Sequence, residues 1–215
     1  MIHALEVMAA GIRQTVMITV TAFLLGAVAG LPLALLRRSA WAVSRVCATV
    51  VVEVLRGVPP IAWLFIVYYA IGSGSVALST FQAAVLGLGL IAAAHLCEAY
   101  RAGLDSVPGG QWQAVAALGL PPRAAYTRVI LPQALVVVVP PMATFAIALL
   151  KESAVASVIG ATDVAFFAVQ QTQQDLNGLG NFAVAGAIYL ALSVPLAAVA
   201  RGVDGALTRR MGLVR

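Results

Sequence analysis

Ionisable side chains lie within or beside apolar runs at two places in this sequence, and such side chains usually have a role there. Glu53 and Arg56 are three residues apart, a spacing that lets two side chains pair on one face of a helix. Lys151, Glu152 and Ser153 follow a second apolar run and offer an ammonium, a carboxylate and a hydroxyl. These three groups could bind both ends of a zwitterion, or Lys151 and Glu152 could form a solvated surface pair.

Metal binding is not expected, because the candidate ligands are badly placed. His95 and Cys97 are two residues apart, which points their side chains about 200° apart on a helix. Cys47 and Cys97 both lie in or beside apolar runs, so we expect two free thiols.

Catalysis by this chain is not expected either. The pairs His95 with Glu98 and Asp163 with Asp175 are the candidates, and neither has the spacing of a known catalytic set. A P-loop requires G-x-x-x-x-G-K-[ST], but the single lysine, Lys151, follows a leucine. The sequence therefore predicts no enzyme, and no metal or cofactor site in this chain.

The elements that must position these residues are membrane helices. The chain has 215 residues, of which 62% are hydrophobic and only 10% charged, whereas soluble domains are about 25% charged. Several charge-free runs reach the roughly 20 residues that cross a bilayer, and the polar segment 72–80 divides the longest run. The sequence predicts an all-α polytopic membrane protein, one domain over 1–215, with five spans: 14–36, 50–71, 81–101, 129–150 and 177–200.

The arginines predict the orientation of the spans. With five spans, one face receives ten arginines: Arg37, Arg38, Arg45, Arg101, Arg123, Arg128, Arg201, Arg209, Arg210 and Arg215. The other face receives Arg13 and Lys151. Cytoplasmic loops carry the basic excess, so we expect the N-terminus outside and the C-terminus inside. The net charge of +5 comes without a Lys/Arg-rich patch, which argues against nucleic-acid binding. The N-terminal stretch lacks the features of a signal peptide, so the first span is expected to remain as an anchor.

The segment 102–128 is predicted to be a cytoplasmic loop with its own structure. Good helix formers precede Gly119, which stands where a glycine with positive φ ends many helices. Pro121 and Pro122 follow, and Pro122 can begin a second short helix. The residues alone leave two interpretations open, a compact knob that another protein contacts or a helix lying on the lipid surface.

The spacing in this loop resembles the EAA loop of bacterial ABC-importer permeases. That pattern is E-A-A, three residues, G, nine residues, I-x-L-P, and here it reads Gln113-Ala114-Val115, Gly119 and Val129-Ile130-Leu131-Pro132. Gln113 replaces the glutamate, and Val115 replaces the second alanine. Three further stretches, 52–69, 98–120 and 149–160, resemble segments of the polar amino-acid permeases in order and spacing.

The resemblance implies the ABC importer permease fold and several partners. Two cytoplasmic ATPase subunits, which bind ATP and Mg, would dock on the loop. A second copy or a sister permease would complete the path, and an external solute-binding protein would deliver a polar amino acid or close derivative across a bacterial inner membrane. The matching coupling residues are Gln113, Ala114, Gly119, Leu120 and Pro132.

The resemblance also implies which residues line the substrate pathway. The family's L-K-[DE]-[ST] segment lines its outer part, which corresponds here to Lys151, Glu152 and Ser153. Glu53 and Arg56 are further candidates, with a structural ion pair as the alternative. For the whole chain, the alternatives are an ion-driven secondary carrier and a membrane scaffold without transport.

Overall fold

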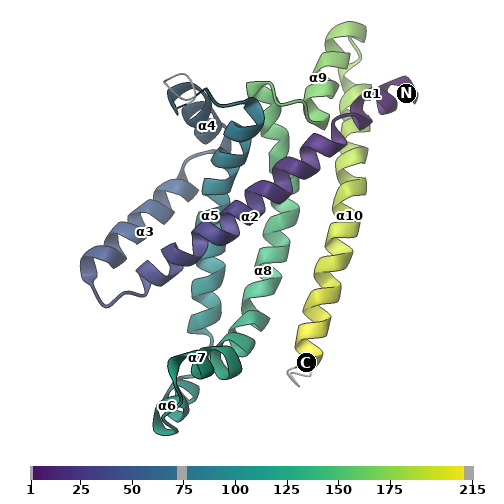
Figure 1. Cartoon of the computed structure of the whole chain (residues 1–215). Helices are drawn as coiled ribbons and strands as arrows, with labels where there is room; N and C mark the ends of the chain where they lie inside the picture. The colour runs from purple at the N-terminus through teal and green to yellow at the C-terminus, as the bar shows by residue number, and fades with distance from the viewer. Residues whose placement is uncertain (1, 72–76, 211–215) are drawn as a thin grey trace.

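The computed structural model describes residues 2–71 and 77–210, and every regular element in those ranges is a helix (Figure 1). In chain order the elements are α1 (Ile2–Ala9), α2 (Ile12–Arg37), α3 (Ala42–Gly57), α4 (Pro60–Phe65), η1 (Ile66–Ile71), α5 (Thr80–Asp105), α6 (Gly109–Ala117), α7 (Pro122–Ala125), η2 (Tyr126–Ile130), α8 (Leu131–Glu152), η3 (Ser153–Ile159), α9 (Val164–Asp175) and α10 (Gly178–Arg210). Most of the dividing segment 72–80, and Arg215 of the arginine count, lie outside the described residues.

Within the described residues, four helices are long and apolar enough to cross a membrane, and they contain α2, α5, α8 and α10. A fifth candidate is the pair Ala42–Gly57 and Pro60–Ile71, which is bent by 103°. The all-α, polytopic architecture agrees with the prediction, and the second span is broken between Gly57 and Pro60.

The break in the second span follows from its prolines. Pro59 and Pro60 have no N–H group, so the carbonyl groups of Leu55 and Arg56 lose the donors that a continuing helix would supply. Val58 between the two helices is extended, with φ −92° and ψ 132°. The chain therefore leaves α3 and turns sharply into α4.

Helix α5 is the centre of the bundle, because 61% of its apolar stretch is buried, compared with 11% for α10. Small residues let α2 approach it closely. A Cβ atom added to Gly26 would lie 2.4 Å from the Cβ of Ala92, and one added to Gly30 would lie 2.7 Å from the carbonyl oxygen of Ala93. Two glycines four residues apart are a common device for close helix contact in membranes.

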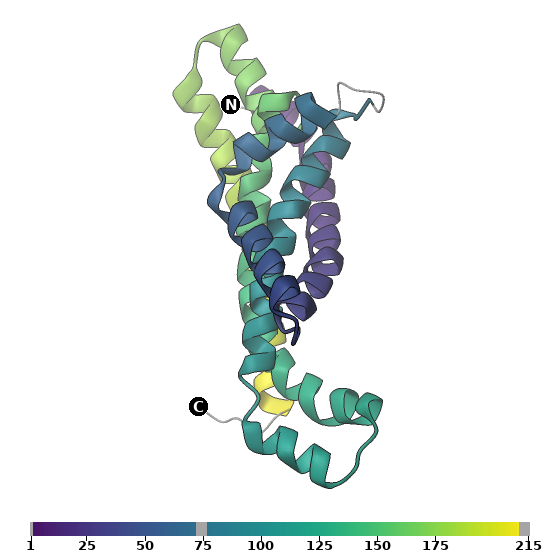
Figure 2. The ribbon, with the colours of Figure 1, turned by 90° about the vertical axis from the view of Figure 1, so that its left-hand side faces the viewer.

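The two ends of the bundle carry different elements. Figures 1 and 2 show α4, α9 and the N-terminus at one end, and α6, α7 and the C-terminal end of α10 at the other. The N-terminal and C-terminal ends of the described chain therefore lie on opposite sides of the bundle, as an odd number of crossings requires.

Candidate functional site

Helices α6 and α7 project beyond the end of the spanning helices as a separate unit (Figure 2). We call residues 109–130 the knob. No residue of α6 is buried, and Gln113 and Ala114 are both exposed. The knob therefore presents a helix whose residues are exposed or half-buried, with Gln113 and Ala114 on its uncovered side.

Gly119 ends α6 in the way its sequence predicts, with a φ of +57°. Its N–H donates to the carbonyl of Ala116 at 3.1 Å, and the N–H of Leu120 donates to the carbonyl of Val115 at 3.3 Å. These two bonds form a Schellman motif, which satisfies carbonyl groups at a helix end. A Cβ on Gly119 would meet no atom of the described chain within 4 Å, so the space beside it is open to a partner.

The knob is joined to α8 by its second half. Helix α7 begins at Pro122, as predicted, and leads through η2 into α8. Trp112 of α6 meets Tyr126 edge to face at 5.7 Å between ring centroids, and it packs against a buried cluster that contains Ile130 and Ala134. Leu120 and Pro132 are half-buried. Helix α6 is therefore in direct contact with the segment that leads into α8.

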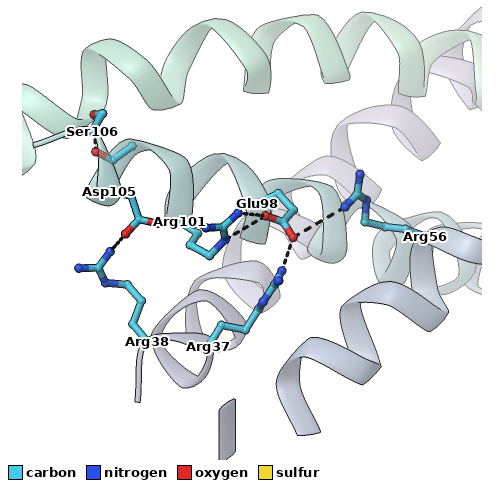
Figure 3. A network of polar contacts seen from close by, with 8 residues as sticks. Arg37, Arg38, Arg56, Glu98, Arg101, Asp105 and Ser106 are labelled. Atoms are coloured by element: carbon cyan, nitrogen blue, oxygen red, sulfur yellow. Dashed lines mark hydrogen bonds and ion pairs between the residues drawn. The ribbon is translucent and has the colours of Figure 1, made fainter. Parts of the chain in front are cut away.

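A network of ionic contacts lies where the ends of α2 and α5 meet (Figure 3). Glu98 of α5 accepts hydrogen bonds from Arg37 of α2 and from Arg101, the latter at 2.9 and 3.1 Å. Arg56 of α3 lies 3.7 Å from the same carboxylate. Three helices are thus tied to one acidic side chain.

The network continues along α5 through Asp105. Its carboxylate accepts from Arg101 at 3.0 Å and pairs with Arg38. The spacing of Glu53 and Arg56 allows them to pair, but among the described residues Arg56 lies near Glu98 instead and no ion pair joins it to Glu53. The sequence suggests Glu98 only as a catalytic candidate with His95. Its position as an acid inside an otherwise apolar span was the signal for an ionic partner.

The segment at the other end of α8 separates its three candidate residues. Lys151 is exposed and Glu152 is half-buried, whereas Ser153 is fully buried. The Ser153 hydroxyl donates to the carbonyl of Leu150 at 2.8 Å. Lys151 and Glu152 thus remain open to a ligand, but the surrounding helices cover Ser153 in this conformation.

Asp163 is a buried carboxylate near this end of the bundle. It caps α9 by accepting from the N–H of Phe166 at 2.8 Å, and the Tyr189 hydroxyl donates to it at 3.4 Å. Beside it, the N–H of Val164 donates to the Thr15 hydroxyl. Burial raises the pKa of Asp163 to about 7, although the hydrogen bonds from Phe166 and Tyr189 act in the opposite direction.

Of the two catalytic pairs, Asp163 and Asp175 do not come together, because they stand at opposite ends of α9. Asp175 is exposed, and the N–H of Asn177 lowers its pKa. His95 stacks on Phe145 of α8 at 4.7 Å between centroids. Within the described ranges, no group of three metal-binding side chains is found, and both cysteines are free thiols.

Residues 22–212 match the sequence pattern of the family described as binding-protein-dependent transport system inner membrane component. The chain belongs to this family. It is a multi-pass permease subunit of an ABC importer, a membrane component rather than a catalytic enzyme.

Bacterial relatives with similar sequences have names that are more specific than the family description. It is 32% identical to a probable amino-acid ABC transporter permease of Sinorhizobium fredii over 97% of this chain and 90% of that protein. It is 33% identical to the arginine transport system permease of Bacillus subtilis over 90% of this chain and 89% of that protein. These relatives confirm the resemblance to amino-acid ABC transporter permeases.

Solved structures confirm the fold of the permease. A chain of an amino acid ABC transporter crystallised with histidines superposes with a TM-score of 0.85 at 27% identity, covering 94% of both chains. A chain of the methionine transporter MetNI in an inward-facing conformation gives 0.77 at 20% identity, covering 94% of this chain and 97% of that one. The second likeness concerns the fold alone.

Proposed function

We propose that this permease carries a polar amino acid, or a close derivative, inward across a bacterial inner membrane. Two cytoplasmic ATPase subunits that bind ATP and Mg drive the transport, a second permease subunit completes the path, and an external solute-binding protein delivers the substrate. The names of the bacterial relatives support the class of substrate.

The observation that carries the proposal is the uncovered knob. Helix α6 has no buried residue, ends at a glycine with open space beside it, and is connected to α8 through Trp112 and η2. A short rigid helix of this kind can seat in a cleft of an ATPase and pass its movement to the spans. Gln113, Ala114, Gly119 and Leu120 form the contact, and Pro132 lies where the movement enters α8.

At the opposite end, Lys151 and Glu152 are the groups that a zwitterion can use. Glu152 accepts from the ammonium of the substrate and Lys151 faces its carboxylate. Ser153 is buried and bonded to Leu150, so its role in the pathway is to hold the turn after α8. Glu53 and Arg56 lie on α3, the first half of the broken second span.

Reconstitution with the ATPase and the solute-binding protein tests the function. We expect a P-loop ATPase to co-purify with the permease, and we expect uptake of an amino acid that requires ATP. Uptake that survives loss of the ATPase would instead identify an ion-driven carrier. A stable permease complex without uptake of any amino acid tested would favour a scaffold.

Glu152→Gln tests the substrate contact in the same vesicles. Loss of the carboxylate removes an acceptor for the substrate ammonium, so we expect uptake to fall at least about tenfold, equivalent to about 1.4 kcal/mol. Glu6→Gln is the matched control, because Glu6 is exposed on α1, and it should transport normally. If Glu152→Gln leaves uptake and substrate-stimulated ATP hydrolysis unchanged, the contact role fails.

A further inference from the structure

The outward face of α3 is apolar but carries one acid. Exposed residues recur every three or four positions along it, which places them on one side of the helix. The exposed residues that share this side are Val43, Val46, Val50, Glu53, Val54 and Gly57, and the other exposed residues of α3 are Ala42, Arg45, Cys47, Val51 and Arg56. The opposite side holds the buried residues Ala48, Val52 and Leu55, of which Val52 and Leu55 pack with residues of α2 and α5. The outward face is therefore left without cover by this chain.

Glu53 is out of place on such a face. It lies within a candidate membrane span, its side chain is exposed, and no cation of the described chain lies within ion-pair distance of it. An acid at membrane depth is rare unless it faces a partner or a cavity. A partner that covers this face must therefore supply a cation.

Arg56 lies about one helical turn from Glu53 on α3, and its guanidinium has N–H donors that are not used in hydrogen bonds among the described residues. Its contact with Glu98 is 3.7 Å long, without a hydrogen bond in the described structure, and its side chain is 38% exposed. Glu98 already accepts from Arg37 and Arg101, as Figure 3 shows. A guanidinium carries five N–H donors, so Arg56 can bind a second carboxylate while it remains near Glu98.

Glu53 on this face and Arg56 beside it make the helix complementary to a copy of itself. Two copies in the same membrane orientation are related by an axis along the membrane normal, and residue i then contacts residue j in both directions. Glu53 and Arg56 differ in height by about 4.5 Å along the helix, which an arginine side chain spans. At the end of this face, a Cβ on Gly57 would meet no atom within 4 Å, which leaves room for a second backbone.

We propose that a second copy of this chain packs its α3 against α3 of the first, with Glu53 of each copy paired with Arg56 of the other. The inference rests on the proposed function, because it names which second permease subunit completes the path. It selects a second copy of this chain over a sister permease, and it assigns the broken second span to the interface.

Cross-linking in membranes locates the interface. In a Cys47→Ser, Cys97→Ala background, Val50→Cys places one thiol on the outward face of α3, and oxidation with iodine joins thiols whose Cα atoms come within about 7 Å. We expect a covalent dimer from Val50→Cys. Val28→Cys is the matched control, because Val28 is 74% exposed on α2, and it should remain monomeric.

Charge exchange between two differently tagged copies tests the pairing. Glu53→Lys in one copy and Arg56→Glu in the other leave one natural pair and one reversed pair, both attractive. Two copies of the same variant leave repulsive pairs only. We expect Val50→Cys cross-linking between the two different variants to exceed that within either variant at least about tenfold.

The outcomes separate this inference from the proposed function. If wild-type vesicles transport an amino acid but Val50→Cys gives no covalent dimer, the interface is wrong and the function stands. Equal cross-linking in the mixed and single-variant samples would overturn the pairing. Cross-linking only when a sister permease is co-expressed would overturn the choice of a second copy.

Discussion

At each end of this permease, one residue is in an unusual state: Gly119 has a positive φ, and Asp163 is a fully buried acid. Gly119 adopts a left-handed φ at the end of α6, a conformation that costs other residues about 1 kcal/mol. Asp163 is buried with only neutral groups as hydrogen-bond partners. A side chain added at Gly119 and the protonation of Asp163 should therefore each have a measurable effect.

Gly119→Asp should abolish uptake while the subunit remains in the membrane. A Cβ at this position meets no atom of the described chain within 4 Å, so the cost to the fold is the strain of a positive φ, about 1–2 kcal/mol, whereas the side chain fills the space proposed for the ATPase. Uptake, with membrane abundance by immunoblot, measures both effects. Gly119→Asn separates the causes, because asparagine tolerates positive φ. If crowding is the cause, it should fail as well. Normal uptake by Gly119→Asp would contradict the docking proposal. For Gln113→Glu, in contrast, we expect normal uptake.

The apparent Tm of the permease should fall as the pH rises from about 5 to about 8. The pKa of Asp163 is raised to about 7 from an ordinary 3.8, so between these values the folded state binds the proton and the unfolded state does not. Stability is then lost as the pH rises toward 7 and levels off above it. Asp163→Asn keeps a capping acceptor and should remove this slope. Equal slopes in both proteins would contradict the assignment.

At the scale of elements, helices far apart in the sequence are joined by close backbone contact and by shared charges. Gly26 and Gly30 let α2 approach α5, and Glu98 then receives Arg37 from α2 and Arg56 from α3. The same end of α5 leads into the knob. The ionic network thus joins α2, α3 and α5 close to the point where α5 leads into the knob.

Glu98→Gln should destabilise the permease more than a similar change nearby. It leaves Arg37, whose side chain is only 12% exposed, without its carboxylate. Loss of a hydrogen bond to a charged group costs about 2 kcal/mol, which corresponds to a Tm lower by roughly 4–8 °C. Asp105→Asn is the control, because Asp105 is 47% exposed and its exposed pairs contribute under about 1 kcal/mol. Thermal unfolding in detergent compares them, and a larger loss for Asp105→Asn would refute the ranking.

At the scale of the whole molecule, the bundle places the knob and the C-terminal end of α10 on one side and the Lys151–Glu152 segment on the other (Figure 1). This separation suits a protein that receives its substrate at one end and its driving force at the other. The orientation of the two ends in the membrane is still a prediction from the arginine count.

A reporter fused after Arg210, at the end of α10, should be active only in a cytoplasmic form. Green fluorescent protein should fluoresce there, and alkaline phosphatase, which requires export, should be inactive. The excess of arginine on that face gives the reason. An active phosphatase at this position would reverse the predicted orientation.

Several features could be predicted from the sequence because they depend on a few neighbouring residues. Apolar runs of about 20 residues specify membrane helices, and a glycine after a run of helix formers specifies the end of α6. Pro122 at the start of α7 is of the same kind. In each case the physical cause is local, either the transfer of a segment into lipid or the φ that a residue can adopt.

Only the tertiary structure decided which charges meet and which polar groups are covered. Arg37 and Glu98 are hydrogen-bonded although they are 61 residues apart in the sequence. Glu53 and Arg56 have the spacing of a helix pair, but Arg56 lies near Glu98 of α5 instead. Ser153 and Asp163 are buried by helices that are distant in the sequence. The partner of an ionisable group depends on which helices pack together. Which helices pack together depends on the summed contacts of whole helix faces, and this cannot be read from the spacing of residues in a motif.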